Sequence, residues 1–236
     1  MEDNYPREWM PQDHDKRKYT KAMEATFASF GEQKPRLLLH ACCAPCSSYS
    51  LELLTPHFAE IDIWFYNPNI TPAAEYALRL AELKRLVDTV DYPCPVTVLD
   101  VPYDPACFFA MAKGMESLPE GGERCWHCYG QRLRSTAEKA ASGAYDYFTT
   151  TLSISPYKNA HWLNAWGVAL GKEVGVPYLL TDLKKNGGYA RSIELSAKYG
   201  LYRQNWCGCV YSQVANEKKR AEIEENSIKT IDNTAE

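Results

Sequence analysis

The chain has 236 residues, of which 45% are hydrophobic, and its formal net charge is −4. This length can bury one good core, and no apolar run approaches the roughly 20 residues that a membrane-spanning helix needs. The negative charge argues against a protein that coats nucleic acid without selectivity, although it leaves room for a local basic face. The amino terminus has no signal-peptide pattern, so we expect a cytoplasmic protein that does not associate with membranes.

The first 35 residues carry one helical pattern. They mix Pro, Asp, Lys and Arg, and apolar side chains then recur at helical spacing as Tyr19, Met23, Phe27 and Phe30. We therefore expect residues 1–35 to form a loose arm and one amphipathic helix. After them we expect a single α/β domain over residues 36–225 and a polar tail over residues 226–236.

Apolar runs bounded by turn residues predict the strands of a sheet. The predicted strands are residues 36–41, 61–66, 96–101 and 145–150, with a short fifth strand at 178–180. The first predicted helix of the domain runs from a cap at Ser47 or Ser48 to about residue 56, and the second covers 72–90 with Thr71 as its cap. A further helix begins at Cys125. The other predicted helices are residues 105–115, 160–174, 190–199 and 212–225.

This alternation of strands and helices predicts right-handed βαβ units. The expected fold class is therefore α/β, with a mostly parallel, doubly wound, Rossmann-like sheet that is covered on both faces. Beyond about Thr181 the pattern is less regular. We expect this part to form a C-terminal cap over the carboxyl edge of the sheet.

The segment from Leu37 to Ser48 organises the predicted site. Its apolar start predicts a buried strand, and the strand ends at small residues and three thiols, Cys42, Cys43 and Cys46, before a helix. In an open α/β sheet, ligands bind where the carboxyl end of a strand meets the amino end of the next helix. Three cysteines at such a junction therefore indicate chemistry more than packing.

The nine cysteines fall mainly into clusters. A cytosolic chain keeps its thiols reduced, so the clusters favour metal binding or thiol redox chemistry over structural disulfides. Cys125 and Cys128 form a CxxC at a helix amino terminus, where we expect the macrodipole and Arg124 to lower the thiol pKa values. Cys42 and Cys43 can supply the other half of a four-thiolate site, which suits zinc or a 4Fe-4S cluster. Adjacent cysteines and the surplus thiol of Cys46 favour the cluster over zinc.

A separate Cys207-Gly208-Cys209 motif predicts a redox pair. The glycine permits the bend that a bridge between Cys207 and Cys209 needs. Such a small, strained ring is easily reduced, which suits a redox couple better than a structural disulfide. The alternative is that both residues are free thiols or metal ligands.

The motif lies within a basic stretch. From Thr181 to Arg220 there are eight lysines and arginines against three acidic residues, an excess of five positive charges. The stretch is therefore a candidate RNA contact, although a solvated surface is an equally simple interpretation. The candidate phosphate contacts are Lys184, Arg191 and Arg203, and the candidate stacking residues are Tyr189, Tyr202 and Trp206.

Taken together, these motifs resemble the QueH type of epoxyqueuosine reductase, a family that completes the queuosine base in transfer RNA. The matching segments are residues 38–48, 66–70, 75–76, 123–129, 132–133, 149–152, 155–157 and 200–212. A tandem Cys, a CxxC and a CGC in this order and context make the resemblance highly specific.

The resemblance implies a metal centre and a substrate. It places a 4Fe-4S cluster on Cys42, Cys43, Cys125 and Cys128, and a redox-active pair at Cys207 and Cys209. It also suggests an additional mononuclear iron near the cluster, for which Cys46 is the candidate ligand. The implied substrate is transfer RNA with epoxyqueuosine at the wobble position, and an electron donor that the sequence does not identify is needed.

Opening an epoxide to an alkene takes two electrons and two protons and releases water. The cluster and the neighbouring iron would reduce the substrate, while Cys207 and Cys209 relay electrons. His40 and Tyr157 are candidate proton donors. Two alternatives stay open at this point: a zinc-stabilised RNA-binding module, and another cluster-dependent enzyme that modifies transfer RNA.

Overall fold

The computed structural model describes residues 18–217 and Ile223. The predicted arm and the predicted polar tail over residues 226–236 lie outside the described residues. Of the predicted closing helix, residues 210–217 are described, and they are helical. Within the described part of the chain, no helix combines the length and the apolar character that crossing a bilayer requires.

The core of the molecule is a four-stranded parallel sheet. Its strands are β1 (Arg36–His40), β2 (Glu60–Trp64), β3 (Val96–Leu99) and β4 (Tyr147–Thr150), in the order β3-β2-β1-β4. In the register, His40 pairs with Trp64 on one side and with Thr150 on the other. The four main strand predictions are confirmed, and β1 is a central strand whose carboxyl end lies in the middle of the sheet edge.

The predicted fifth strand is wrong. Only a single bridge between Phe148 and Tyr178 forms there. Side chains bind the segment beyond this bridge: Thr149 Oγ1 donates to Leu179 O at 2.9 Å, and the Asn164 side chain accepts from Thr181 N–H at 2.9 Å and donates to Thr181 O at 2.8 Å. A side chain of the preceding helix thus takes the place of a neighbouring strand.

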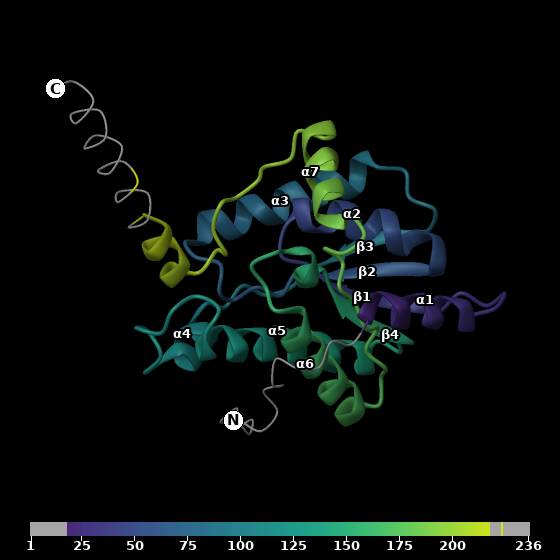
Figure 1. Ribbon diagram of the computed structural model, residues 1–236, viewed down its shortest axis with the longest axis horizontal. Coiled ribbons are helices and arrows are strands. Elements are labelled where there is room, and N and C mark those ends of the chain that lie inside the picture. The colour runs from purple at the N-terminus through teal and green to yellow at the C-terminus, as the bar shows by residue number, and fades with distance from the viewer. Residues whose placement is uncertain (1–17, 218–222, 224–236) are drawn as a thin grey trace.

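Helices cover both faces of the sheet (Figure 1). They are α1 (Tyr19–Ser29), α2 (Ala44–Leu54), α3 (Ala73–Thr89), α4 (Ala106–Ala112), α5 (Glu123–Ser142), α6 (Ala160–Val174) and α7 (Gly188–Lys198), with 3-10 turns η2 (Thr55–His57) and η3 (Thr151–Ile154). Leu37 and Leu39 pack in a core with α1, α2 and α3, whereas Leu38 packs in the core under α5 and α6. Successive residues of a strand point to opposite faces, so this division confirms the doubly wound arrangement.

Two predicted helix caps are wrong. Helix α2 begins at Ala44 with Cys43 as its N-cap, and the side chains of Ser47 and Ser48 instead donate to carbonyls within the first turns. Helix α3 has Pro72 as its N-cap, one residue after the predicted cap, and the Thr71 N–H donates to Gly208 O at 2.9 Å.

The C-terminal segment forms the predicted cap. Helix α7 packs on α2. The irregular chain after it is tied to α3, where Arg85 donates to Tyr199 O and Gly200 O, each at 3.1 Å. The segment then carries Cys207 to the carboxyl edge of the sheet, where the Cys207 sulfur meets Lys158.

Candidate metal centre and cavity

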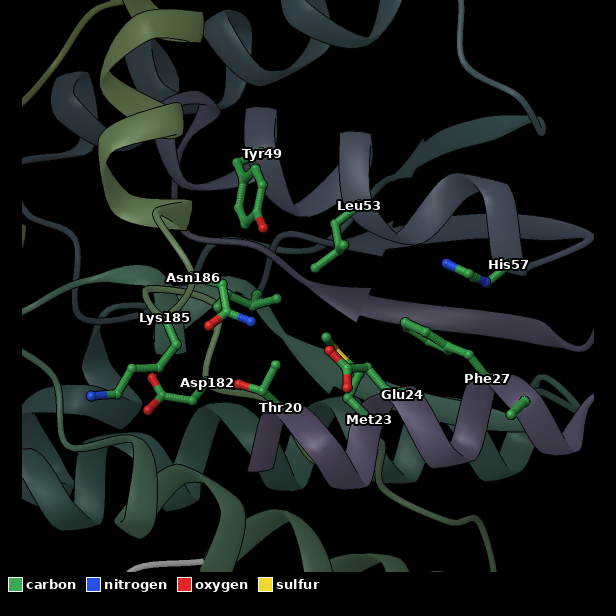
Figure 2. Close-up of a pocket in the computed structure, with 12 residues that line it drawn as sticks. Thr20, Met23, Glu24, Phe27, Tyr49, Leu53, His57, Asp182, Lys185 and Asn186 are labelled. Carbon is green, nitrogen blue, oxygen red and sulfur yellow. The ribbon is translucent and has the colours of Figure 1, made fainter. Parts of the chain in front are cut away.

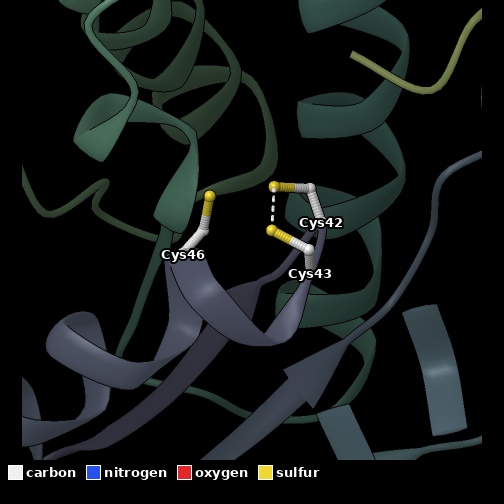
Figure 3. A group of neighbouring side chains, drawn as sticks. All are labelled: Cys42, Cys43 and Cys46. Atoms are coloured by element: carbon white, nitrogen blue, oxygen red, sulfur yellow. Dashed lines mark hydrogen bonds between the residues drawn. The ribbon is translucent and has the colours of Figure 1, made fainter. Parts of the chain in front are cut away.

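Three thiols converge at the end of β1. The Cys42 and Cys43 sulfurs are 3.7 Å apart, and the ligand atoms of Cys42, Cys43 and Cys46 all lie within 4.8 Å of one another (Figure 3). Cys43 is extended at the N-cap, and Cys46 lies on the first turn of α2. The strand-to-helix junction therefore gathers three side chains that are potential metal ligands.

These three thiols shift one another's pKa values. Hydrogen bonding with Cys43 and Cys46 holds the pKa of Cys42 well below its usual value. The same contacts raise the pKa of Cys43 to about 12 and raise the pKa of Cys46. A metal ion would displace the remaining protons, because thiolates, not thiols, are the ligands.

The two cysteines of the CxxC lie on the first turns of α5. Cys125 packs in the same apolar cluster as Cys42 and Cys43, whereas Cys128 packs beside Cys209. Among the described residues, neither belongs to the group of thiols within 4.8 Å, so the structure brings Cys46 closer to the tandem pair than the CxxC. The predicted four-thiolate set stays a prediction.

The electrostatics of the CxxC differ from the sequence-based prediction. Burial raises the pKa of Cys125 and raises the pKa of Cys128 to about 11. Desolvation therefore outweighs the helix amino terminus. Arg124 contributes little because its guanidinium is turned away, donating to the carbonyls of Met115, Glu116 and Leu118.

Arg132 is a buried cation beside the thiols. It is 1% exposed, and it donates from Nε to Cys128 O at 3.3 Å and from Nη1 to Asn67 Oδ1 at 3.5 Å. Its Nη2 is buried without a hydrogen-bond partner, and no ion pair to a carboxylate is found for it in the described part of the chain. Burial alone would lower the pKa of Arg132, but the nearby sulfurs of Cys128, Cys207 and Cys42 raise it. A buried cation whose nearest potential anions are sulfurs fits a negatively charged metal–sulfur centre.

The CGC pair is present as thiols. All nine cysteines are free, so the predicted disulfide between Cys207 and Cys209 is not supported. The Cys209 thiol hydrogen bonds to Cys207, and Lys158 Nζ lies 3.3 Å from the Cys207 sulfur; these contacts hold the pKa of Cys207 well below its usual value. The pKa of Cys209 is raised by the same pairing. Gly208 has a φ of +110°, which is the bend that the sequence predicts.

The thiols at the end of β1 and the CGC pair open onto one cavity of about 650 Å³, which is lined by Cys42, Cys46 and Cys207. Its other lining residues include four cations and one acid, namely Arg79, Arg132, Lys158, Arg203 and Glu120, and three aromatic residues, Tyr157, Tyr189 and Trp206. Tyr157 is 82% exposed at this site. The cavity therefore combines thiols, positive charge and aromatic surface.

The candidate RNA contacts separate into two groups. Arg203, Tyr189 and Trp206 line the cavity. Lys184 instead pairs with Asp182, and Arg191 pairs with Glu52 and Glu194. The sixth candidate, Tyr202, donates to the Glu75 carboxylate. Lys184 and Arg191 are thus engaged in ion pairs within the chain.

His40 is a satisfied core residue. It is fully buried, with Nδ1 2.8 Å from Thr150 Oγ1 and Nε2 3.1 Å from Tyr66 O. Burial lowers its pKa to about 3. His40 therefore stays neutral at physiological pH, and it does not line the cavity.

Sequence reasoning did not assign roles to Lys158 and Arg132. Arg132 follows Cys128 by four residues, so helical periodicity places both on one face of α5 and was a usable signal. Lys158 lies in the loop between η3 and α6, where no periodic pattern points to the Cys207 sulfur. Only the folded chain brings Lys158 and Cys207 together.

A second cavity, of about 440 Å³, lies between α1, α2 and the segment before α7 (Figure 2). Its walls include Met23, Phe27, Tyr49 and Leu53, with Lys185 at one end. No cysteine lines it. The thiol chemistry therefore belongs to the larger cavity.

Comparison with known proteins identifies the family. The family model described as "Epoxyqueuosine reductase QueH" matches residues 37–215. The chain belongs to the QueH family. The QueH match covers the sheet, all nine cysteines and most of the larger cavity, and it begins after α1.

Curated QueH relatives are similar along most of their length. The protein from Streptococcus pyogenes serotype M1 is 43% identical over 181 residues, covering 76% of this chain and 71% of the relative. The protein from Staphylococcus epidermidis is 42% identical over 184 residues, covering 76% and 77%. The protein from Thermotoga maritima is 34% identical over 192 residues, covering 79% and 95%. Each of the three is named "Epoxyqueuosine reductase QueH".

Proposed function

We propose that the chain is an epoxyqueuosine reductase, which converts epoxyqueuosine to queuosine in the anticodon of transfer RNA. The observation that carries this proposal is that a QueH-family chain places two groups of thiols on one cation-lined cavity. The reaction removes the epoxide oxygen as water and leaves an alkene. It takes two electrons and two protons.

The thiols are the proposed cofactor ligands. Cys42, Cys43, Cys125 and Cys128 would hold a 4Fe-4S cluster, and Cys46 would help to hold a mononuclear iron. The convergence of three sulfurs at the β1–α2 junction and the buried Arg132 Nη2, which has no hydrogen-bond partner, support this assignment. Such a centre supplies one-electron transfer and a Lewis acid for the epoxide oxygen.

The proposed role of Cys207 and Cys209 is to hold the reducing equivalents. Two thiols that join as a disulfide release two electrons and two protons, which is the number that the substrate takes up as the oxygen leaves in water. Lys158 favours the Cys207 thiolate through its contact at 3.3 Å. An external electron donor would then return the disulfide to two thiols.

The cavity suits a single nucleotide that is turned out of the anticodon loop. Its volume of about 650 Å³ lies in the range of about 300–1,000 Å³ that small-molecule sites occupy. Arg203 would face phosphate oxygens, and Tyr157 and Trp206 offer rings on which bases can stack. Exposed anticodon bases are the part of transfer RNA that such a surface can bind.

We further infer that residues 36–225 work as one domain, in the cytoplasm. The reducing cytosol would keep the nine thiols free, which agrees with their state in the structure. It is also where a transfer RNA substrate is found.

A nucleoside assay tests the proposed activity. Anaerobic protein is incubated with a chemical reductant and transfer RNA containing epoxyqueuosine, and digested nucleosides are analysed by mass spectrometry. We expect queuosine to accumulate with the native chain and with Cys94→Ala, since Cys94 is buried away from the cavity, but not with Cys42→Ala. No queuosine from the iron-loaded native chain, or full turnover by Cys42→Ala, would contradict the proposal.

A further inference from the structure

A buried ion pair on α3 lies under the CGC loop. Arg79 is 1% exposed, and its Nε donates to Glu75 Oε1 at 2.7 Å. The Glu75 side chain is 11% exposed. Burying a guanidinium costs free energy of desolvation unless specific contacts compensate for it. The contacts of Arg79 should therefore explain why it is buried here.

The guanidinium binds the backbone of the redox loop. Arg79 Nη1 donates to Cys207 O at 3.1 Å, and the Trp206 ring centroid is 5.4 Å from its Cζ. A Cβ at Gly208 would lie 3.0 Å from Arg79 Nη1 and 2.9 Å from Ile70 Cγ1. The glycine is therefore needed for the close approach of Arg79 as well as for the positive φ.

Two further hydrogen bonds hold the backbone of the CGC loop. Thr71 N–H donates to Gly208 O at 2.9 Å, and Cys207 N–H donates to Ser212 Oγ at 3.1 Å. Arg79 supplies the contact at the Cys207 carbonyl, whereas Lys158 meets the Cys207 sulfur. Arg79 thus acts on the backbone of Cys207 and not on its thiol.

We propose that Arg79, oriented by Glu75, is a positioning residue that holds Cys207 and Cys209 in the conformation in which their sulfurs face each other. This inference rests on the redox role proposed for that pair. When the loop is held in one backbone conformation, each thiol meets the other at a higher effective concentration than in a loop that samples many conformations. The disulfide between Cys207 and Cys209 therefore forms more readily. Without Arg79 the loop loses that preference, and the disulfide becomes easier to reduce.

Glutathione titration of the full-length protein measures this effect. Two thiols and glutathione disulfide give the protein disulfide and two molecules of glutathione. After alkylation, the tryptic peptide from Gln204 to Lys218 reports the pair by mass spectrometry, because Cys207 and Cys209 are its only cysteines. The variants are Arg79→Met and the control Arg85→Met, since Arg85 ties the same segment to α3 through two carbonyls before the CGC loop.

For Arg79→Met we expect a tenfold loss in the disulfide equilibrium constant, which corresponds to a midpoint about 30 mV less negative. The midpoint for Arg85→Met should match the native one. An unchanged midpoint in Arg79→Met, or an equal shift in Arg85→Met, would overturn the positioning role. If Arg79→Met does not fold, Glu75→Gln is tested in its place. We expect its midpoint to shift in the same direction by a smaller amount, and an unchanged midpoint would overturn the proposal. A native chain that forms no disulfide at any glutathione ratio would instead reject the proposed redox pair.

Discussion

Replacing Lys158 by Met should raise the pKa of Cys207. The ammonium is 3.3 Å from the sulfur, and two unit charges at that distance attract by about 5 kcal/mol at an effective dielectric constant of about 20. At about 1.36 kcal/mol per pKa unit, this sets an upper bound of about 3–4 units. Lys158 is half-buried, so water would replace part of the lost stabilisation of the thiolate. We expect a rise of about 1–2 units.

The pH dependence of alkylation measures this rise. The rate at which iodoacetamide modifies Cys207 in reduced, anaerobic protein follows the thiolate fraction, which increases as the pH passes the pKa. The midpoint of the profile for Lys158→Met should therefore move to higher pH. Lys185→Met is the control, because Lys185 is exposed and lines the smaller cavity. An unmoved midpoint in Lys158→Met would refute the view that this contact stabilises the thiolate, and would leave the Cys209 hydrogen bond as its cause.

Three further predictions concern iron, RNA and packing. Cys46→Ser should lose about one iron per chain and keep its acid-labile sulfide, measured by metal and sulfide analysis; loss of sulfide as well would place Cys46 among the cluster ligands. Tyr157→Ala should weaken binding of an anticodon stem-loop by about tenfold, measured by fluorescence anisotropy, since stacking on one base contributes about 1–3 kcal/mol. The exposed Phe109 on α4 provides the control Phe109→Ala, and equal affinities of both variants would contradict stacking at Tyr157. Gly130→Ala should lower the free energy of unfolding by about 1–3 kcal/mol in urea titrations, because its Cβ would lie 2.5 Å from the Trp166 ring; an unchanged midpoint would show that the ring can move aside.

The fold was largely predictable because its signals are local. Apolar runs at 36–41 and 61–66 lead to β1 and β2, and the predicted helix at 160–174 is α6 to the residue. The failures lie where distant groups compete for the backbone. Thr149 Oγ1 binds Leu179 O within the predicted fifth strand, Asn164 binds Thr181 just after it, and Thr71 donates its N–H to Gly208 O.

The site was predictable in its parts and not in its geometry. Motif spacing identified the tandem cysteines, the CxxC and the CGC, and glycine correctly indicated the bend between Cys207 and Cys209. The predicted lowering of the CxxC pKa values is wrong because burial, which no motif encodes, dominates at Cys128. The contact of Lys158 with Cys207 joins residues 49 positions apart, and it depends on the whole fold.

The most direct test of the redox account is the iron, zinc and acid-labile sulfide content per chain of anaerobically purified protein, measured with its visible spectrum. The account predicts about four sulfides and about four or five irons per chain, with the brown colour of an iron–sulfur cluster. One zinc and no sulfide, after anaerobic reconstitution has also failed, would contradict the redox account and favour a zinc-stabilised protein.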